Sequence, residues 1–464
     1  MTRARRRIAI VGGTAAGPAA AAEASRTDPD ADITMFEAGP DISWGVCELP
    51  MLLSGEIERA DELIVFEPDQ FKDRYGVQVE TGTRVESIEA ETLTLDVRSE
   101  DGQVSTRRFD AVVLATGTRA VIPDGLRTDA PNVTLLRSIG DARRIREQLR
   151  DHSVHHAVVV GGGYLGIEAA EALHIQGVRV TLLQRGDRLM GRVLGDELAH
   201  VLSDRLTRAG VNIRFETATG LDVRSDGRVQ AVRTAAGEKI GCQAVILGAG
   251  VAPNSELARD AGLALGVADA VSVNERLATS AHGIWACGDC ITQADPVTKR
   301  SIWVPLALPA YRSGHVAGRN AARRGRGKPA TMKSVVPVYG LRVFDTEVAV
   351  VGSDREGLRA AGYEPVDVYA SQVNRASLLE HDRIHMSLTA DRSTGRLLGG
   401  RFVGGAGAAL RANALSMAVR LGATADDLYD LDTVYTPRIA PMHDVLTVAG
   451  RQMQKALGRG GGRE

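Results

Sequence analysis

The feature that most constrains the fold of this chain is a pattern that occurs twice: an apolar strand, a glycine-rich turn, a helix and a second strand. Each turn would bring backbone N–H groups close to the pyrophosphate of a dinucleotide at a helix N-terminus. The turn residues of the first copy are Gly12, Gly13, Ala16 and Gly17. Those of the second copy, which has the full G-x-G-x-x-G spacing, are Gly161, Gly163, Tyr164, Leu165 and Gly166. Two such folds predict two dinucleotides that exchange electrons, against the alternative of one working site and one decayed repeat.

The residues that end each second strand predict what each copy binds. Glu37 closes the strand 32–37, where an acid accepts hydrogen bonds from ribose hydroxyls. The corresponding strand of the second copy is followed by Gln184, Arg185 and Arg188, with no acid at the position that NAD-selective sites use. A carboxylate there would repel a 2′-phosphate, whereas arginine would pair with it. The sequence therefore favours NADPH with NADH still possible, and the alternative is that the arginines are simply solvated.

Composition indicates an ordinary globular protein. The chain has 464 residues, of which 44% are hydrophobic and 25% charged, and this length suits about three domains. Its net charge of −2 gives no electrostatic reason to expect nucleic acid or a membrane surface as a partner. Four cysteines are too few for a disulfide scaffold, so a reducing compartment, the cytoplasm, is expected. No metal site is expected.

Strand and turn patterns divide the chain into four segments, 1–120, 121–250, 251–328 and 329–464. The first ends in an apolar strand and the turn Ala115-Thr116-Gly117, and the second ends in a similar strand and Gly250. The third contains Gly288-Asp289, and the fourth has a new series of strands and a helix over 408–421. The predicted fold class is α/β, with two Rossmann-like dinucleotide-binding domains and a C-terminal α+β domain.

Together these motifs resemble the pyridine nucleotide-disulfide oxidoreductases, flavoproteins with FAD-binding, NAD(P)-binding and C-terminal interface domains. The resemblance implies that 1–120 and 251–328 bind FAD, that 121–250 binds NAD(P)H, and that 329–464 forms a homodimer. In this family the carboxylate of the Gly-Asp pair, here Asp289, accepts a ribityl hydroxyl of the flavin. The other cofactor positions that the resemblance implies are Ser43, Val85, Glu168, Gly250 and Gly288.

Cys47 stands in the segment S-W-G-V-C-E-L-P, shortly after the first dinucleotide unit. The next cysteine is Cys242, so a redox disulfide between close neighbours on one helix is impossible. The segment resembles the single-cysteine branch of the family, which contains coenzyme A-disulfide reductases, NADH oxidases, NADH peroxidases and persulfide reductases. Its C-x-L-P form and the stretch 66–71 favour the coenzyme A-disulfide reductases. The resemblance implies a redox thiol against the flavin, and the alternative is a buried structural thiol.

The remaining cysteines are interpreted as packing residues. Cys287 and Cys290 form a C-x-x-C, which could be a redox pair. However, they flank Gly288-Asp289, which the resemblance assigns to the flavin. Cys242 has no partner in sequence.

The segment 435–441 resembles the family's Y-x-P-P-x-x-P motif, which crosses a two-fold interface. This implies that Tyr435 lies near the partner subunit's Cys47, where a phenol can protonate a leaving thiolate. The stretch 375–381 lacks the second tyrosine that coenzyme A-disulfide reductases carry there. Glu48 replaces a small residue, and a carboxylate beside Cys47 would disfavour the thiolate.

Some positions that contact coenzyme A in the family are retained and others are not. The retained substrate positions are Arg26, Ser43 and Phe71. Val46 and Tyr75 replace an asparagine and a basic residue. These differences concern the substrate and leave the flavin chemistry intact.

The expected function is transfer of electrons from NADPH through FAD and Cys47 to a small-thiol disulfide, with coenzyme A disulfide as the first candidate. One alternative is an oxidase or peroxidase in which Cys47 cycles through sulfenic acid. Another is a persulfide or polysulfide reductase. A third is a flavoprotein of low turnover that signals through its redox state.

Overall fold

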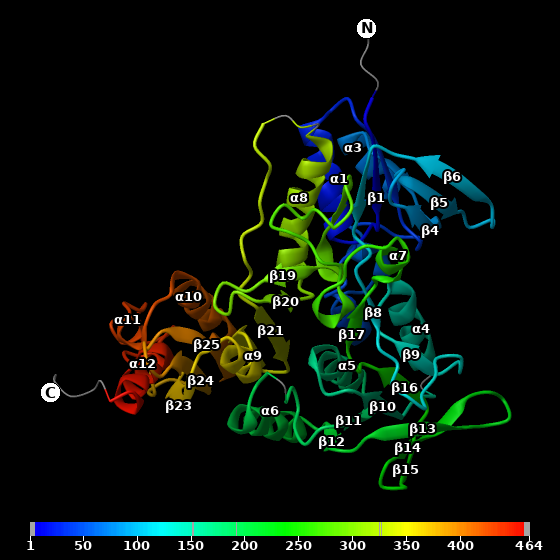
Figure 1. Cartoon of the computed structure of the whole chain (residues 1–464). Coiled ribbons are helices and arrows are strands. Elements are labelled where there is room, and N and C mark those ends of the chain that lie inside the picture. Colours follow the sequence, from blue (N-terminus) through cyan, green and yellow to red (C-terminus); the bar gives the residue numbers. More distant parts are fainter. Residues whose placement is uncertain (1–4, 151–152, 192, 324, 326, 459–464) are drawn as a thin grey trace.

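The computed structural model describes residues 5–150, 153–191, 193–323, 325 and 327–458. The first parallel sheet has the strand order β18-β7-β1-β2-β3. Its strands are β1 (Arg7–Val11), β2 (Asp32–Phe36), β3 (Gln78–Glu80), β7 (Ala111–Leu114) and β18 (Ile284–Ala286). Every residue of β7 is buried, which is why its sequence is an unbroken apolar run. Because β18 joins from a distant segment, the chain returns to its first sheet after building the second (Figure 1).

Helices α1 (Ala16–Thr27) and α8 (Ala307–Ala322) pack tightly against each other beside the first sheet. A Cβ atom on Gly314 would lie 2.4 Å from the Ala16 carbonyl oxygen, and one on Gly318 would lie 2.0 Å from that of Ala20. Glycine is therefore required at both positions of α8. An antiparallel sheet flanks this unit and consists of β4 (Arg84–Glu89), β5 (Thr94–Arg98) and β6 (Val104–Arg108).

The second parallel sheet repeats the architecture, with the order β12-β11-β10-β16-β9. Its strands are β9 (Val133–Leu135), β10 (His156–Val160), β11 (Arg179–Leu183), β12 (Asn212–Arg214) and β16 (Ala244–Leu247). Its helices are α4 (Ile139–Arg150), α5 (Tyr164–Ile175) and α6 (Asp196–Arg208). A small antiparallel sheet of β13 (Ala218–Val223), β14 (Val229–Thr234) and β15 (Lys239–Gly241) extends from it (Figure 1).

The C-terminal unit is an antiparallel sheet with helices packed on it. Its strand order is β21 (Val338–Val343), β22 (Thr346–Gly352), β25 (Leu397–Gly404), β24 (Arg383–Asp391) and β23 (Pro365–Val373). Helices α10 (Ala408–Leu421) and α12 (Val445–Ala456) share one core with this sheet, and α10 has the bounds predicted from the sequence. The predicted fold class, two dinucleotide-binding α/β units and an α+β unit, is confirmed.

Shorter elements complete the surroundings of the site. They are α2 (Leu49–Ser54), α3 (Pro68–Tyr75), α7 (Glu256–Asp260), α9 (Arg355–Ala360), α11 (Ala425–Tyr429), β8 (Thr118–Ala120), β17 (Val251–Pro253), β19 (Thr292–Ala294) and β20 (Ser301–Trp303). Helix α2 packs against both α4 and α5, so the segment that carries Cys47 is held against the second dinucleotide unit.

Candidate active site

The first glycine turn has the tight geometry that a bound pyrophosphate needs. Gly12 has φ +114°, and a Cβ on it would lie 2.2 Å from the Ala115 carbonyl oxygen. A Cβ on Gly17 would lie 1.8 Å from the Gly12 carbonyl oxygen. Only glycine fits either position, which lets α1 begin directly against the end of the sheet.

Glu37 is fixed at the end of β2 by two backbone donors. Its Oε2 accepts from the Gly13 N–H at 2.7 Å, and its Oε1 accepts from the Gly39 N–H at 2.7 Å. Beside it runs a cleft of about 890 Å³ that Val85 and Thr116 also line. The predicted residues Gly12, Glu37, Val85 and Thr116 thus line one cleft, which suits the adenosine half of a dinucleotide.

The second glycine turn repeats this arrangement. A Cβ on Gly166 would lie 1.8 Å from the Gly161 carbonyl oxygen. Gln184 Oε1 accepts from the Gly162 N–H at 2.8 Å, as Glu37 does from Gly13 in the first unit. Gln184 therefore takes the place of the acid with a neutral amide, which does not repel a 2′-phosphate.

The two predicted phosphate-reading arginines differ in their surroundings. Arg185 is exposed and makes no hydrogen bond or ion pair within the described part of the chain. Arg188 donates to both carboxylate oxygens of Asp187, at 2.8 and 2.7 Å, and also forms an ion pair with Asp196. Only one of the two guanidinium groups is free to receive a ligand.

Cys47 lies immediately before α2 and differs from the other cysteines in its exposure. Its side chain is exposed, whereas Cys242, Cys287 and Cys290 are buried. The protein around the sulfur removes part of its solvation, and this raises the pKa of Cys47; the carboxylates of Glu48, Glu168 and Asp289 raise it further. The positive charge of Arg137 lowers the pKa of Cys47. The prediction that Glu48 disfavours the thiolate agrees with the rise in pKa that Glu48 causes.

Asp289 provides an acceptor without a partner. Its Oδ1 is buried and has no hydrogen-bond partner, and burial raises the pKa of this carboxyl to about 6. An orphaned acceptor is costly unless a ligand satisfies it. The site therefore fits a cofactor hydroxyl at Asp289, as expected for the ribityl chain of FAD.

Sequence reasoning missed Arg137, which lies just after β9. Its guanidinium donates to the carbonyl oxygen and the hydroxyl of Thr118 at 2.8 and 2.9 Å. The positive charge of Arg137 lowers the pKa of Cys47, which the nearby acids raise. It also lowers the pKa of Asp289. A charged residue just beyond the carboxyl end of a buried parallel strand was the signal that could have identified it.

One face of α5 lines the other side of the site. Burial, with a contribution from Glu171, raises the pKa of Glu168 to about 7. The hydroxyl of Tyr164 is buried without a partner, and its ring stacks on Tyr339 of β21 at 5.5 Å between centroids. Cys47 and Glu168 line one cavity of about 530 Å³, so the thiol and this helix share a single space. Tyr339 was not identified from the sequence, because it comes from the C-terminal unit.

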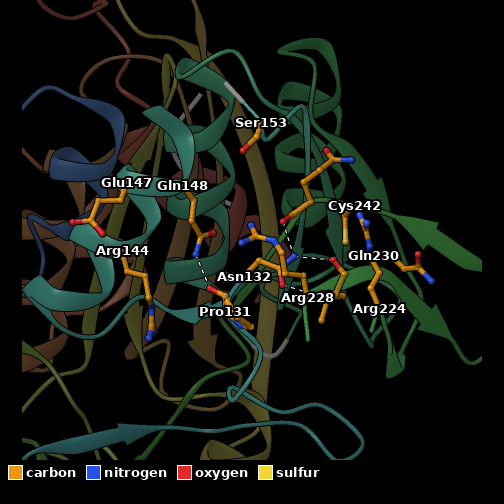
Figure 2. Close-up of a pocket in the computed structure, with 12 residues that line it drawn as sticks. Pro131, Asn132, Arg144, Glu147, Gln148, Ser153, Arg224, Arg228, Gln230 and Cys242 are labelled. Atoms are coloured by element: carbon orange, nitrogen blue, oxygen red, sulfur yellow. Dashed lines mark hydrogen bonds between the residues drawn. The ribbon is translucent and has the colours of Figure 1, made fainter. Parts of the chain in front are cut away.

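The three buried cysteines differ from Cys47 in their surroundings. Cys290 Sγ lies 3.2 Å from the Cys287 carbonyl oxygen, in the short turn that positions Asp289. Cys242 lies in a depression of about 640 Å³ beside β14, apart from the site (Figure 2). Asn132, which lines this depression, donates its side-chain amide to the carbonyls of Val229 and Gln243. We find no redox geometry there.

Of the predicted coenzyme A positions, Arg26 lies on an aromatic and basic surface, whereas Phe71 is buried beneath that surface. Phe71 is only 2% exposed and packs between Phe66 and Tyr75. The Arg26 guanidinium lies 5.3 Å from the ring centre of Tyr75, and that of Arg74 lies 5.3 Å from Phe66. Arg74 thus supplies a basic group next to position 75, which itself lacks one. Ser43 lies nearer the first turn, with its N–H donating to the Gly13 carbonyl at 2.8 Å.

Tyr435 is 53% exposed on the C-terminal unit, far along the chain from Cys47. The Ala376 N–H donates to the Pro437 carbonyl at 3.0 Å, so the stretches 375–381 and 435–441 lie together. Leu378 and Ile439 in these stretches are 97% and 66% exposed. Large exposed apolar side chains gathered on one unit are typical of a surface that a second subunit covers.

The described residues also bear on metal binding and on membrane insertion. No group of three or more histidine, cysteine or acidic side chains is placed to hold a metal ion there. Within the same residues, no helix combines the length and the apolar character that crossing a bilayer requires.

Comparison with known proteins gives consistent matches along the chain. The pyridine nucleotide-disulphide oxidoreductase model matches residues 6–318, and the dimerisation domain of the same family matches residues 338–444. The chain is 32% identical over 455 residues to the CoA-dependent NAD(P)H sulfur oxidoreductase of Pyrococcus abyssi, covering 98% of this chain and 99% of that protein. It is 26% identical to the coenzyme A disulfide reductase of Staphylococcus haemolyticus, covering 96% of this chain and 98% of that one.

A solved structure shows the same likeness in three dimensions. The NAD-dependent persulfide reductase of A. fulgidus superposes with a TM-score of 0.91 at 31% identity, over 97% of this chain and 84% of that one. Membership of this family implies FAD and NAD(P)H as cofactors. With its two dinucleotide units, its dimerisation unit and its exposed thiol, the chain belongs to the pyridine nucleotide-disulphide oxidoreductase family.

Proposed function

We propose that this flavoprotein reduces a small-thiol disulfide with electrons from NAD(P)H, and that Cys47 is the thiol through which they pass. The observation that carries the proposal is the position of Cys47. It is the exposed cysteine of the chain, and it shares its surroundings with Asp289 and Arg137. Residues 1–120 and 251–328 would hold FAD, and 121–250 would hold the nicotinamide nucleotide.

The proposed reaction has two steps at Cys47. Bound FAD supplies a two-electron carrier between the nicotinamide and the thiol. The Cys47 thiolate attacks one sulfur of a disulfide RSSR, which forms a mixed disulfide and releases RS⁻. Two electrons then cleave the mixed disulfide, which releases the second RS⁻ and restores the Cys47 thiolate. The sum is NAD(P)H + H⁺ + RSSR → NAD(P)⁺ + 2 RSH.

The chain's own groups would orient and protonate the reactants. Arg137 stabilises the thiolate of Cys47 against the nearby acids. Asp289 would hold the ribityl chain, and Tyr164 and Glu168 would face the nicotinamide from α5. In a homodimer, Tyr435 of the partner subunit would donate a proton to the leaving thiolate.

Coenzyme A disulfide is the first substrate candidate, because Arg26, Arg74 and the rings of Phe66 and Tyr75 offer charge and stacking to a nucleotide-bearing thiol. For the electron donor we propose NADPH over NADH, because Gln184 leaves no carboxylate against a 2′-phosphate and Arg185 is free. Free, unpaired cysteines fit a reducing compartment, and we propose the cytoplasm.

A second candidate is reduction of a persulfide or polysulfide. The favouring observation is that relatives named for sulfur or persulfide reduction are 32% and 31% identical, against 26% for the coenzyme A disulfide reductase. The same thiol chemistry would apply, with sulfide as the released group.

The test is a comparison of acceptors with the purified, FAD-loaded protein. NADPH oxidation would be followed with coenzyme A disulfide, with a coenzyme A persulfide and with oxygen alone, while sulfide release is measured in parallel. Intact-protein mass spectrometry would identify the thiol on resting Cys47. The proposal expects turnover with a disulfide or persulfide and little oxygen uptake. Rapid oxygen consumption without any sulfur acceptor would replace it with an oxidase.

A further inference from the structure

The loop between β11 and α6 carries the arginines that would read a 2′-phosphate, and it is anchored at residues 189 and 190. The Met190 N–H donates to the Gly162 carbonyl at 2.9 Å, and Leu189 is completely buried. Arg188 comes directly before these residues. Its backbone is therefore fixed beside the nucleotide turn, and only its side chain can change partners.

The guanidinium of Arg188 is paired with two carboxylates. Asp187 accepts from its Nε and Nη2 at 2.8 and 2.7 Å, and Asp196, the first residue of α6, pairs with its Nη1. The stem of Arg188 lies flat on Gly191, where a Cβ would meet its Cγ at 2.6 Å. Glycine at 191 thus allows the side chain to lie along the loop toward α6.

We propose that Asp187 and Asp196 determine nucleotide selectivity by competing with a 2′-phosphate for Arg188. To pair with the phosphate, Arg188 must leave both carboxylates, which would then face a group carrying almost two negative charges. NADH has no 2′-phosphate, so it can bind while Arg188 stays paired with both carboxylates. Arg185 is then the main phosphate-reading residue, and the acids keep the preference for NADPH small enough that both nucleotides are used.

This inference rests on the proposed NAD(P)H site and extends it to residues outside the glycine motif. Both acids are well exposed, with side chains 77% accessible, so their removal should not disturb the fold. Glu197 provides a matched control, because it lies in the same first turn of α6 and carries the same charge but does not pair with Arg188.

The test measures dissociation constants of NADP⁺ and NAD⁺ for the FAD-loaded protein by calorimetry. Asp196→Asn should tighten NADP⁺ binding by about three- to tenfold and leave NAD⁺ binding unchanged, and Asp187→Asn should act in the same direction. Glu197→Gln should change either constant by less than about twofold. Adding Arg188→Ala to Asp196→Asn should remove the gain.

Three outcomes would overturn the inference. They are unchanged NADP⁺ affinity in Asp196→Asn, an equal gain in Glu197→Gln, or a gain that persists without Arg188. Binding is measured without a sulfur acceptor, so these results are independent of whether the protein reduces disulfides. If the variants shift selectivity as expected but no disulfide or persulfide is reduced, the proposed function fails and the inference on Arg188 stands.

Discussion

Two glycines of the second turn offer a perturbation whose effects the structure separates. A Cβ on Gly166 would lie 1.8 Å from the Gly161 carbonyl oxygen, whereas real Cβ atoms essentially never come within 3.0 Å of a non-bonded heavy atom of a more distant residue. Gly166→Ala must therefore push α5 away from the turn by more than about 1 Å. A Cβ on Gly163 meets nothing within 4 Å, so Gly163→Ala is compatible with the folded chain.

Gly166→Ala should change the stability of the fold, whereas Gly163→Ala should change nucleotide binding. Displacing a buried helix should cost Gly166→Ala about 2–4 kcal/mol of the free energy of unfolding, which is roughly 5–15 °C in the thermal transition of this unit. Gly163→Ala should keep the wild-type transition but weaken NADP⁺ binding by about tenfold or more. Its methyl group would stand where the pyrophosphate approaches the backbone.

Differential scanning calorimetry and nucleotide titration of the FAD-loaded protein would measure both effects. A Gly163→Ala variant that binds NADP⁺ as tightly as the wild type would show that the pyrophosphate does not approach this turn. A Gly166→Ala variant of unchanged stability would refute the steric argument.

Three further predictions address the thiol, the flavin and the C-terminal unit. Glu48→Gln removes a negative neighbour, so the pKa of Cys47 should fall and alkylation of the thiol should begin at lower pH; an unchanged pH profile would mean that Glu48 points away in the loaded enzyme. Asp289→Leu removes the orphaned acceptor and should speed FAD loss, measured as flavin fluorescence released on dilution. Asp444→Leu strands Arg411, whose Nε donates to Asp444 at 2.8 Å, and should cost about 3–5 kcal/mol of stability in urea unfolding; a loss below 1 kcal/mol would contradict this.

Much of the fold could be predicted from the sequence because the residues that define it act within short segments of the chain. Gly17 is required by a contact within its own turn, with the Gly12 carbonyl, and Gly12 itself has a positive φ, so the glycine spacing alone indicates the unit. Glu37 and Gln184 follow their strands at equivalent positions, and the structure gives them equivalent hydrogen bonds to Gly13 and Gly162.

What the sequence did not predict depends on contacts between distant segments. Arg137 meets the surroundings of Cys47 and Asp289 only through the packing of the two dinucleotide units. Tyr339 reaches Tyr164 from the C-terminal unit. Burial of Phe71 and the pairing of Arg188 with Asp196 likewise depend on how a helix lies against its neighbours, which a residue pattern does not specify.

The central claim is that electrons leave the flavin through Cys47, and one experiment tests it directly. Stopped-flow reduction of Cys47→Ser by NADPH would be compared with its turnover on coenzyme A disulfide or persulfide. The account predicts a variant that binds FAD and accepts hydride at near wild-type rate but reduces no sulfur acceptor. It also predicts measurable activity when Cys242, Cys287 and Cys290 are replaced together. An active Cys47→Ser, with a Cys287→Ser that is inactive although FAD remains bound, would place the redox centre at the C-x-x-C pair and contradict the account.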